Sequence, residues 1–471
     1  MVLGYIGSLL RGIWFRSRPK ISTAYEPPPT EEGAEAQTLR SALSSYVYCA
    51  PNLSLLEKLC LDRYWQFLAD RVYPPWLAPN LITLAGGFCI LLAAALSGWH
   101  SPQLCGSSPR WLYACNALLL FAYQSLDGSD GKQARKTHTG SPLGELMDHG
   151  IDAWTVGPIV LFTIDAFAFG ITSPWPWLIV LGAQACFLLS NVTLLHTGRM
   201  LVSELDVIEL QTAMYLSLLL TAACGPGIWA TRLPLPTRLM KPLMVRYDGF
   251  GFHLDWTAGL PVRDALGVVI VLVMATNALA TTATVVSELM RAPPAASSPP
   301  HSADTNCGAT LASTTAPPLA PPVPSAPPPK PPCAGFAALG RQLAFLFGYV
   351  GLVLACFSSA TSRLPAAEAP AALLSLLLLS SFAFAGDTYR LLACRVGHMP
   401  LPKISRGLSC LLGYWVCVWA GAASPAALLV PTAAAACCAV GVFVRTTRQV
   451  SAALRLHPFR VRGAKHWYSL C

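Results

Sequence analysis

Four carboxylates lie close together in this chain, between two strongly apolar stretches. Asp127 and Asp130 are three residues apart, and Asp148 and Asp152 are four apart, so each pair shares one face if its segment is helical. Burying an unpaired carboxylate beside lipid is costly, so a cluster of four must bind a cation or perform a task. Two helix ends that face each other would bring these oxygens to one point, which predicts a Mg²⁺ or Mn²⁺ site.

The full pattern contains small residues as well as acids. From Asp127 to Asp152 it reads D-x2-D-G-x2-A-R-x8-G-x3-D-x3-D, and it resembles the signature of the CDP-alcohol phosphotransferases in every fixed position. Gly131, Ala134 and Gly144 would let a backbone or a bulky nucleotide approach closely. An acidic loop that only needed charge would not need these residues, so the pattern favours a binding site over a solvated loop.

The resemblance implies a role for each residue of the pattern. The four aspartates would hold the divalent metal, and the small residues would border a CDP-alcohol. Such a substrate is a diphosphate, whose charge a metal ion neutralises before an alcohol can approach. Arg135 would donate as a fork to phosphate oxygens. The alternative for Arg135 is an arginine that marks the end of a membrane span.

Transfer to an alcohol also needs a base that accepts the hydroxyl proton. His149 directly follows Asp148, and an imidazole exchanges protons near neutral pH. Glu145 lies four residues before it, so on a helix this carboxylate would reach the imidazole and orient it. Asp152 is the rival base, because the resemblance implies this role for it: the corresponding aspartate is often taken as the base in the wider family.

Residues 78–86, APNLITLAG, open the first predicted span. They closely resemble the corresponding segment of the eukaryotic choline/ethanolamine phosphotransferases, which implies that Asn80 helps to bind the nucleotide. Capping of the following helix is the alternative for Asn80. The detailed resemblance covers about 55–155, with weaker similarity through the later spans and at the C-terminus.

Composition places these motifs in a membrane protein. Of the 471 residues 54% are hydrophobic and 12% are charged, about half the charged fraction of a soluble domain. The segment 55–72, in which Tyr64 and Phe67 are among the apolar residues, is predicted to be an amphipathic helix at the membrane surface. The chain is thus predicted to be an all-α integral membrane protein with about ten transmembrane helices, at roughly 80–99, 111–128, 153–171, 174–196, 207–230, 262–288, 338–358, 368–386, 407–423 and 425–444.

Lysine and arginine set the predicted orientation. The loops after the second and eighth spans and the C-terminal tail are basic, and ten spans put them on the same side as the basic N-terminus. The positive-inside rule makes that side cytosolic. One loop departs from the rule, because its basic residues would face the lumen: Arg232, Arg238, Lys241 and Arg246.

The sequence divides into five segments. Residues 1–54 are predicted to be a basic, mostly flexible segment, and 55–291 to be the catalytic core with the surface helix and spans one to six. Residues 292–333 hold 14 of the chain's 40 prolines and predict a disordered linker. Residues 334–444 would form spans seven to ten, and 445–471 a basic cytosolic tail.

The resemblance implies an enzyme that transfers phosphocholine or phosphoethanolamine from CDP-choline or CDP-ethanolamine to diacylglycerol, with Mg²⁺ or Mn²⁺ as cofactor. It also implies a homodimer in the lipid of the endoplasmic reticulum or Golgi membrane, with its active site facing the cytosol. Headgroup preference is left open.

Other functions fit the sequence less well. A CDP-diacylglycerol-dependent phosphatidyltransferase, such as phosphatidylinositol synthase, is the alternative, but those enzymes are generally shorter and lack the Glu-x2-Asp-His arrangement. A cation transporter would scatter its acids over several spans, whereas these cluster at one loop. No segment combines aromatic and basic residues as nucleic-acid binding requires, so no such partner is expected.

Overall fold

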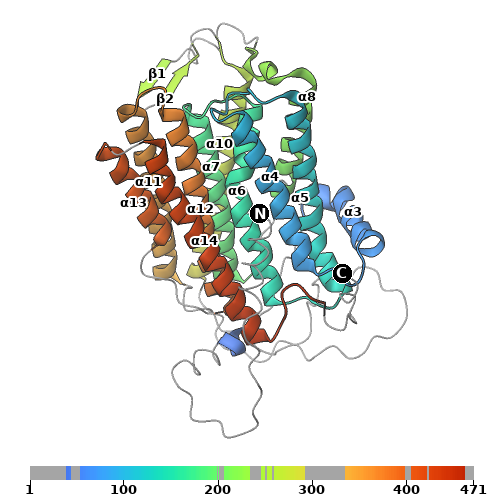
Figure 1. Ribbon diagram of the computed structural model, residues 1–471. Helices are drawn as coiled ribbons and strands as arrows, with labels where there is room; N and C mark the ends of the chain where they lie inside the picture. The colour runs from blue at the N-terminus through green and yellow to red at the C-terminus, as the bar shows by residue number, and fades with distance from the viewer. Residues whose placement is uncertain are drawn as a thin grey trace, which may run out of the picture. The chain divides into compact units, whose positions relative to one another are not determined.

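The apolar runs form helices, as the pattern predicts. Backbone N–H and C=O groups inside a bilayer must be satisfied internally, and a helix achieves this within one segment. In the computed structural model of the protein, each of the ten predicted runs overlaps a helix of its own (Figure 1). They are α4 (Pro79–His100), α5 (Arg110–Lys136), α6 (Pro142–Ala166), α7 (Pro174–Thr197), α8 (Val207–Cys224), α10 (Val262–Met290), α11 (Phe336–Arg363), α12 (Ala369–Gly397), α13 (Arg406–Trp419) and α14 (Pro425–Leu454).

The described residues belong to one structural unit, which begins at Leu39. The predicted linker 292–333 and nearly all of the predicted flexible segment 1–54 lie outside the described residues, so these two interpretations stay predictions. Helix α14 continues ten residues into the predicted tail, since it ends at Leu454. The structure describes residues 39–43, 53–198, 200, 206–233, 246–249, 252–256, 259–291, 335–397, 405–421 and 424–461.

Seven helices in the described part of the chain are long and apolar enough to cross a membrane, so this is an integral membrane protein. The three that fall short do so for physical reasons. Helices α5 and α6 carry the charged residues of the motif. Helix α13 has only 14 residues, which span about 21 Å, whereas the hydrocarbon core is about 30 Å thick. The count of ten spans therefore remains a proposal.

Helices α6 and α12 lie against each other, and most of their residues are buried. Glycines on α6 permit this close approach. Gly157 faces Ser381 and Gly150 faces Tyr389, and a Cβ at either glycine would overlap the facing side chain. Because α6 carries half of the acidic motif, this packing fixes that half in place.

The segment before α4 is helical, as predicted, and has a second packed face that the periodicity did not reveal. Two π-helical turns, η1 (Glu57–Leu61) and η2 (Leu68–Val72), flank α3 (Asp62–Phe67). Phe67, on the predicted apolar face, is 55% exposed, as a residue that meets lipid would be. Trp65 and Ala69 are buried instead, and the segment packs against α5.

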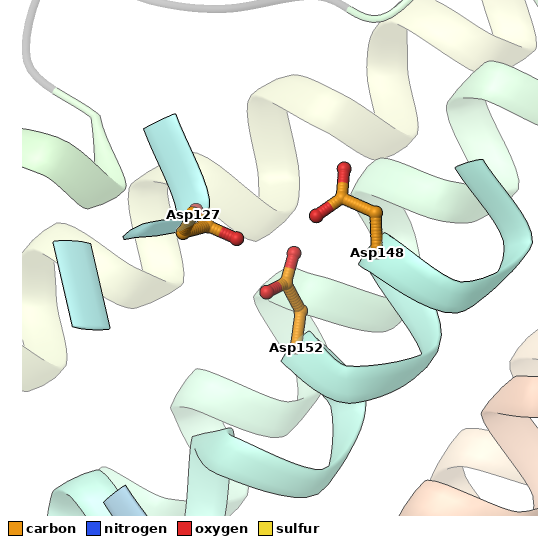
Figure 2. Close-up of side chains that lie close together, drawn as sticks. All are labelled: Asp127, Asp148 and Asp152. Carbon is orange, nitrogen blue, oxygen red and sulfur yellow. The ribbon is translucent and has the colours of Figure 1, made fainter. Parts of the chain in front are cut away.

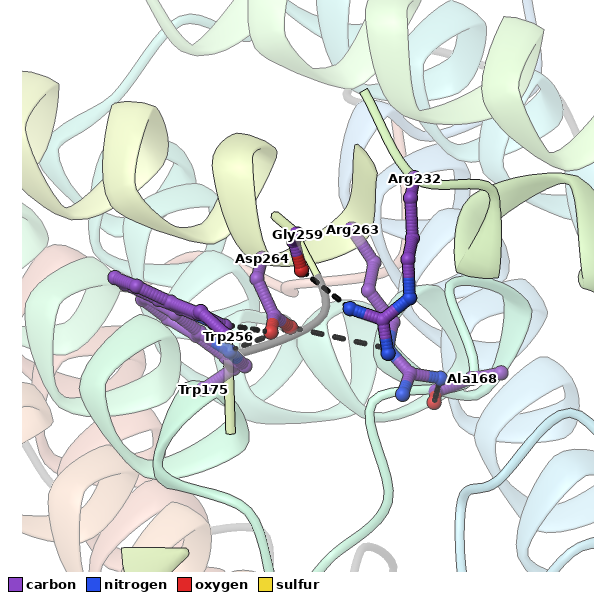
Figure 3. Close-up of polar contacts among 7 residues, drawn as sticks. All are labelled: Ala168, Trp175, Arg232, Trp256, Gly259, Arg263 and Asp264. Carbon is purple, nitrogen blue, oxygen red and sulfur yellow. Dashed lines mark hydrogen bonds and ion pairs between the residues drawn. The ribbon is translucent and has the colours of Figure 1, made fainter. Parts of the chain in front are cut away.

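The end of the helices opposite the acidic motif is held by contacts around Asp264 (Figure 3). Its carboxylate accepts hydrogen bonds from Trp175 Nε1 at 3.0 Å and from Trp256 Nε1 at 2.7 Å. Between α8 and α10 the chain also forms an antiparallel hairpin of β1 (Arg246–Gly249) and β2 (Phe252–Asp255). The all-α prediction did not include these two strands, each of four residues.

A contact with the backbone gives one basic residue a structural role in the loop that departs from the positive-inside rule. The Arg232 guanidinium donates to the carbonyl oxygen of Gly259, and nearby Arg263 donates to that of Ala168 at 2.9 Å (Figure 3). Arg232 therefore braces the loop rather than serving only as a topology signal, and Arg263 ties the start of α10 to the residues that follow α6. The side chains of the other basic residues in this loop lie outside the described set.

The glycine contact between α6 and α12 generates a prediction. Gly157→Ala should lower the stability of the purified protein by about 1–3 kcal/mol, because the added methyl group overpacks against Ser381. Gly98→Ala is the matched control, since a Cβ there would meet nothing within 4 Å. Thermal unfolding in detergent measures both. Equal melting temperatures for the two variants would contradict the proposed close contact.

Candidate metal centre and active site

A short turn places the motif's two aspartate pairs at the same end of successive helices. Helix α5 ends at Lys136 and α6 begins at Pro142. The Ser141 hydroxyl accepts a hydrogen bond from the backbone N–H of Gly144 at 3.2 Å and so caps α6. Proline is favoured at the first helical position because its missing N–H would have no helical partner there. Local sequence thus fixes where the second half of the motif starts.

Three of the four predicted metal ligands come together. Carboxylate oxygens of Asp127, Asp148 and Asp152 lie within 4.8 Å of one another, and Figure 2 shows the first from α5 facing the other two on α6. Negative oxygens this close repel one another unless they are neutralised. Mg²⁺ and Mn²⁺ prefer carboxylate oxygen ligands, so this donor set fits such an ion.

The fourth predicted ligand, Asp130, has a partner of its own. It lies one turn beyond Asp127 on α5 and is buried, and its carboxylate accepts a hydrogen bond from the hydroxyl of Thr83 on α4. The structure thus places Asp130 beside the group of three rather than in it. Its role as a metal ligand stays a prediction.

Tyr123 is a residue of this site that the sequence analysis missed. Its hydroxyl donates to Asp152 Oδ1 at 2.6 Å and accepts from Thr155 Oγ1 at 3.1 Å. This chain of hydrogen bonds orients the Asp152 carboxylate toward the other acids. Its spacing could have indicated a place in the site, because Tyr123 lies four residues before Asp127 and so shares its face of α5.

The predicted base and its acidic neighbour lie on α6, with an added partner from α12. His149 is buried, directly after Asp148. The Glu145 carboxylate accepts a hydrogen bond from the Arg395 guanidinium, and both side chains of this ion pair are less than 10% exposed. The sequence analysis predicted only that the Glu145 carboxylate orients the His149 imidazole. The structure adds an arginine, so the last helices of the chain also take part in the site.

Two of the residues predicted to bind the CDP-alcohol, Asn80 and Gly144, face one space, and the alternative role of Asn80 is wrong. Ala78 occupies the N-cap position of α4, and Asn80 is the second residue of the helix. Asn80 is therefore not the N-cap residue. The Asn80 amide donates at 2.7 Å to the carbonyl oxygen of Pro458, so residues just after α14 also reach this place. A Cβ added at Gly144 would lie 3.8 Å from Asn80 Oδ1, so these two residues face the same space.

The remaining predicted residues lie along the end of α5. The Arg135 side chain is exposed and can reach a ligand from solvent. Gly131 and Ala134 are partly buried, and a Cβ at Gly131 would come only within 3.8 Å of Arg135. The space beside this face of α5 is therefore open. Their assignment to the substrate remains a prediction.

Comparison with known proteins finds a family match that includes the acidic residues. Residues 76–240 match the family described as CDP-alcohol phosphatidyltransferase. The chain is 35% identical over 213 residues to Cholinephosphotransferase 1 of Xenopus laevis, covering 45% of this chain and 52% of that protein. It is 38% identical over 193 residues to Cholinephosphotransferase 1 of Gallus gallus, covering 41% and 57%.

A plant relative matches a shorter stretch. Choline/ethanolaminephosphotransferase 1 of Arabidopsis thaliana is 42% identical over 146 residues, which cover 30% of this chain and 36% of that protein. The chain spans about half the length of the vertebrate relatives that it matches.

The acidic group predicts metal binding that can be measured without a substrate. Tyr123→Phe should weaken Mn²⁺ binding about 10- to 100-fold, as loss of a group that orients a ligand does, and Asp148→Asn should weaken it more. Electron paramagnetic resonance of Mn²⁺ with the purified protein measures both affinities. Glu288→Gln, at a partly exposed acid near the end of α10, is the control. Unchanged Mn²⁺ binding by Asp148→Asn would refute the predicted metal site.

Proposed function

We propose that this chain, whose residues 76–240 belong to the CDP-alcohol phosphatidyltransferase family, is a membrane-embedded CDP-alcohol phosphotransferase. The donor is CDP-choline or CDP-ethanolamine and the acceptor is diacylglycerol. The products are CMP and phosphatidylcholine or phosphatidylethanolamine. The observation that carries the proposal is the convergence of Asp127, Asp148 and Asp152 within the matched segment. The names of the matched relatives support the choice of headgroups.

The chain's own residues bind and orient the donor. A divalent cation held by the three aspartates would neutralise the diphosphate charge. Arg135 donates to phosphate oxygens from the exposed end of α5. Asn80 and Gly144 border the nucleotide, and Gly131 and Ala134 leave room for it along α5. These assignments follow from the open space and the donor types described above.

The transfer itself exchanges one phosphorus–oxygen bond for another. The hydroxyl oxygen of diacylglycerol bonds to the β-phosphorus as the bond from that phosphorus to the bridging oxygen breaks, and CMP leaves with the bridging oxygen. The hydroxyl proton passes to His149, which later releases it to solvent. The Glu145 carboxylate, held by Arg395, lies one turn before His149 on α6 and orients the imidazole. Asp152 is the rival base, but its hydrogen bond from Tyr123 favours a ligand role.

The membrane arrangement is part of the proposal. All ten helices that match the predicted spans cross the bilayer, including α5, α6 and the short α13. Basic residues at the ends of α5 and α12 support a cytosolic active site by the positive-inside rule. The membrane is that of the endoplasmic reticulum or Golgi, and the protein is a homodimer.

A turnover assay with three donors tests the function. Purified protein in micelles with Mg²⁺ receives diacylglycerol plus radiolabelled CDP-choline or CDP-ethanolamine, or inositol plus CDP-diacylglycerol. We expect labelled phospholipid from at least one of the first two donors and none when Mg²⁺ is chelated. Product from CDP-diacylglycerol and inositol alone would overturn the proposal in favour of a phosphatidyltransferase.

Substitution of the candidate bases generates a further prediction. His149→Ala should lower kcat about 10²- to 10⁴-fold, the usual effect of losing a general base, while Mn²⁺ affinity stays near the wild-type value. His100→Ala is the control, because His100 ends α4 at the opposite end and is exposed. Near-normal turnover by His149→Ala, together with complete loss in Asp152→Asn at saturating Mg²⁺, would identify Asp152 as the base.

A further inference from the structure

The end of α5 has two sides, and only one of them faces the acidic site. The other side contacts residues 57–77, the segment that precedes α4. The residues on this second side all occupy unspecified positions of the acidic pattern. They are Gly128, Ser129, Lys132, Gln133 and Lys136.

An ion pair with one buried partner joins the two segments. The Lys132 side chain is 7% exposed, and its Nζ lies 2.5 Å from Asp62 Oδ1 on α3. An ammonium group removed from water requires a close partner, and losing that partner is costly. Asp62 is still 44% exposed, so the aspartate keeps access to water at the edge of the contact. The pair therefore ties α3 to one face of α5.

An aromatic contact lies beside this pair. The Trp65 side chain is 3% exposed and lies against the α5 backbone at Gly128. A Cβ at Gly128 would overlap the indole ring, so glycine is required for this approach. Next to it, the hydroxyls of Tyr73 and Ser129 are 2.8 Å apart. The unspecified positions between Asp127 and Asp130 are thus both used for docking.

The last turn of α5 binds the end of the segment. Gln133 and Lys136 donate to backbone carbonyl oxygens in η2 and in the residues that follow it, where helical N–H partners are missing. The distances are between 2.6 and 3.0 Å. The acceptors are the carbonyls of Ala69, Tyr73, Pro74 and Leu77. These bonds prevent the end of η2 from moving independently of α5.

The start of the segment is also fixed. The backbone N–H of Leu56 donates to Glu209 Oε1 at 2.8 Å, and Glu209 belongs to the capping box of α8. Helix α8 in turn packs along α5. The segment is therefore anchored at both ends to elements outside it, so it can act as a fixed support.

We propose that residues 57–77 are a positioning element that sets the rotation of α5 and thereby aims Asp127 at Asp148 and Asp152. Neighbouring residues on a helix point about 100° apart, so a hold on Gly128 and Lys132 determines where Asp127 points. Mg²⁺ requires near-ideal geometry, so even a small rotation of α5 weakens binding. The inference rests on the proposed function, because it gives the segment a role at that metal site.

Removal of the ion pair tests this role. Lys132→Met keeps the length of the side chain but loses its charge, and should weaken Mn²⁺ binding about 10- to 100-fold in purified protein without substrate. Lys132→Arg should retain most of the affinity. Asp62→Asn should also weaken binding, whereas Asp70→Asn is the matched control, because Asp70 is exposed on the same segment and accepts from Gln66 within that segment.

A second-site pair separates positioning from stability. Gly128→Ala should weaken Mn²⁺ binding, because its methyl group pushes Trp65 and the segment away from α5. Adding Trp65→Leu, which removes the overlapping ring, should recover most of that affinity. A merely structural role predicts lower melting temperatures with unchanged Mn²⁺ affinity of the folded protein.

The outcomes distinguish this inference from the proposed function. Wild-type Mn²⁺ affinity in both Lys132→Met and Gly128→Ala would show that the segment only stabilises the fold, and the proposed function would stand. Absence of Mn²⁺ binding by the wild-type protein would overturn both. Weakened binding in both variants, with recovery in the double variant, is the expected result.

Discussion

The surrounding structure depends on one constraint, the close approach of three carboxylates at the ends of two helices of this membrane protein. Their oxygens lie within 4.8 Å of one another. Their mutual repulsion is strong because lipid and buried protein screen charge poorly. A bound cation relieves it only where the oxygens already converge. The nearby polar contacts serve that convergence, since Tyr123 orients Asp152 and Thr83 holds Asp130.

The two halves of the site are held by different kinds of contact. Helix α6 is fixed by close packing, in which Gly157 and Gly150 let α12 approach. The end of α5 is fixed by polar contacts with the segment that precedes α4, among them the Lys132–Asp62 ion pair. Apolar packing suits a helix surrounded by other helices, whereas hydrogen bonds and ion pairs suit a helix end with access to water.

The sequence predicted what local spacing encodes and missed what depends on distant partners. Apolar runs located the ten helices, and the intervals within the motif put Asp148 and Asp152 on one face of α6. The ion pair of Glu145 with Arg395 joins residues 250 positions apart, so no periodicity could reveal it. The docking of Trp65 on Gly128 was hidden for a related reason, because a surface helix and a docked helix share the same amphipathic pattern. The short hairpin lay in a basic loop without a clear strand signal.

The pair of Glu145 and Arg395 also imposes an order on biosynthesis. The ribosome makes the first turn of α6 long before the arginine that binds it. Until α12 has been translated and inserted, the Glu145 carboxylate is without that arginine, and burying its charge among apolar helices is costly. Tight packing around α6 must therefore wait for α12. The contact between Glu145 and α12 can therefore form only late in synthesis, after most of the chain has been translated.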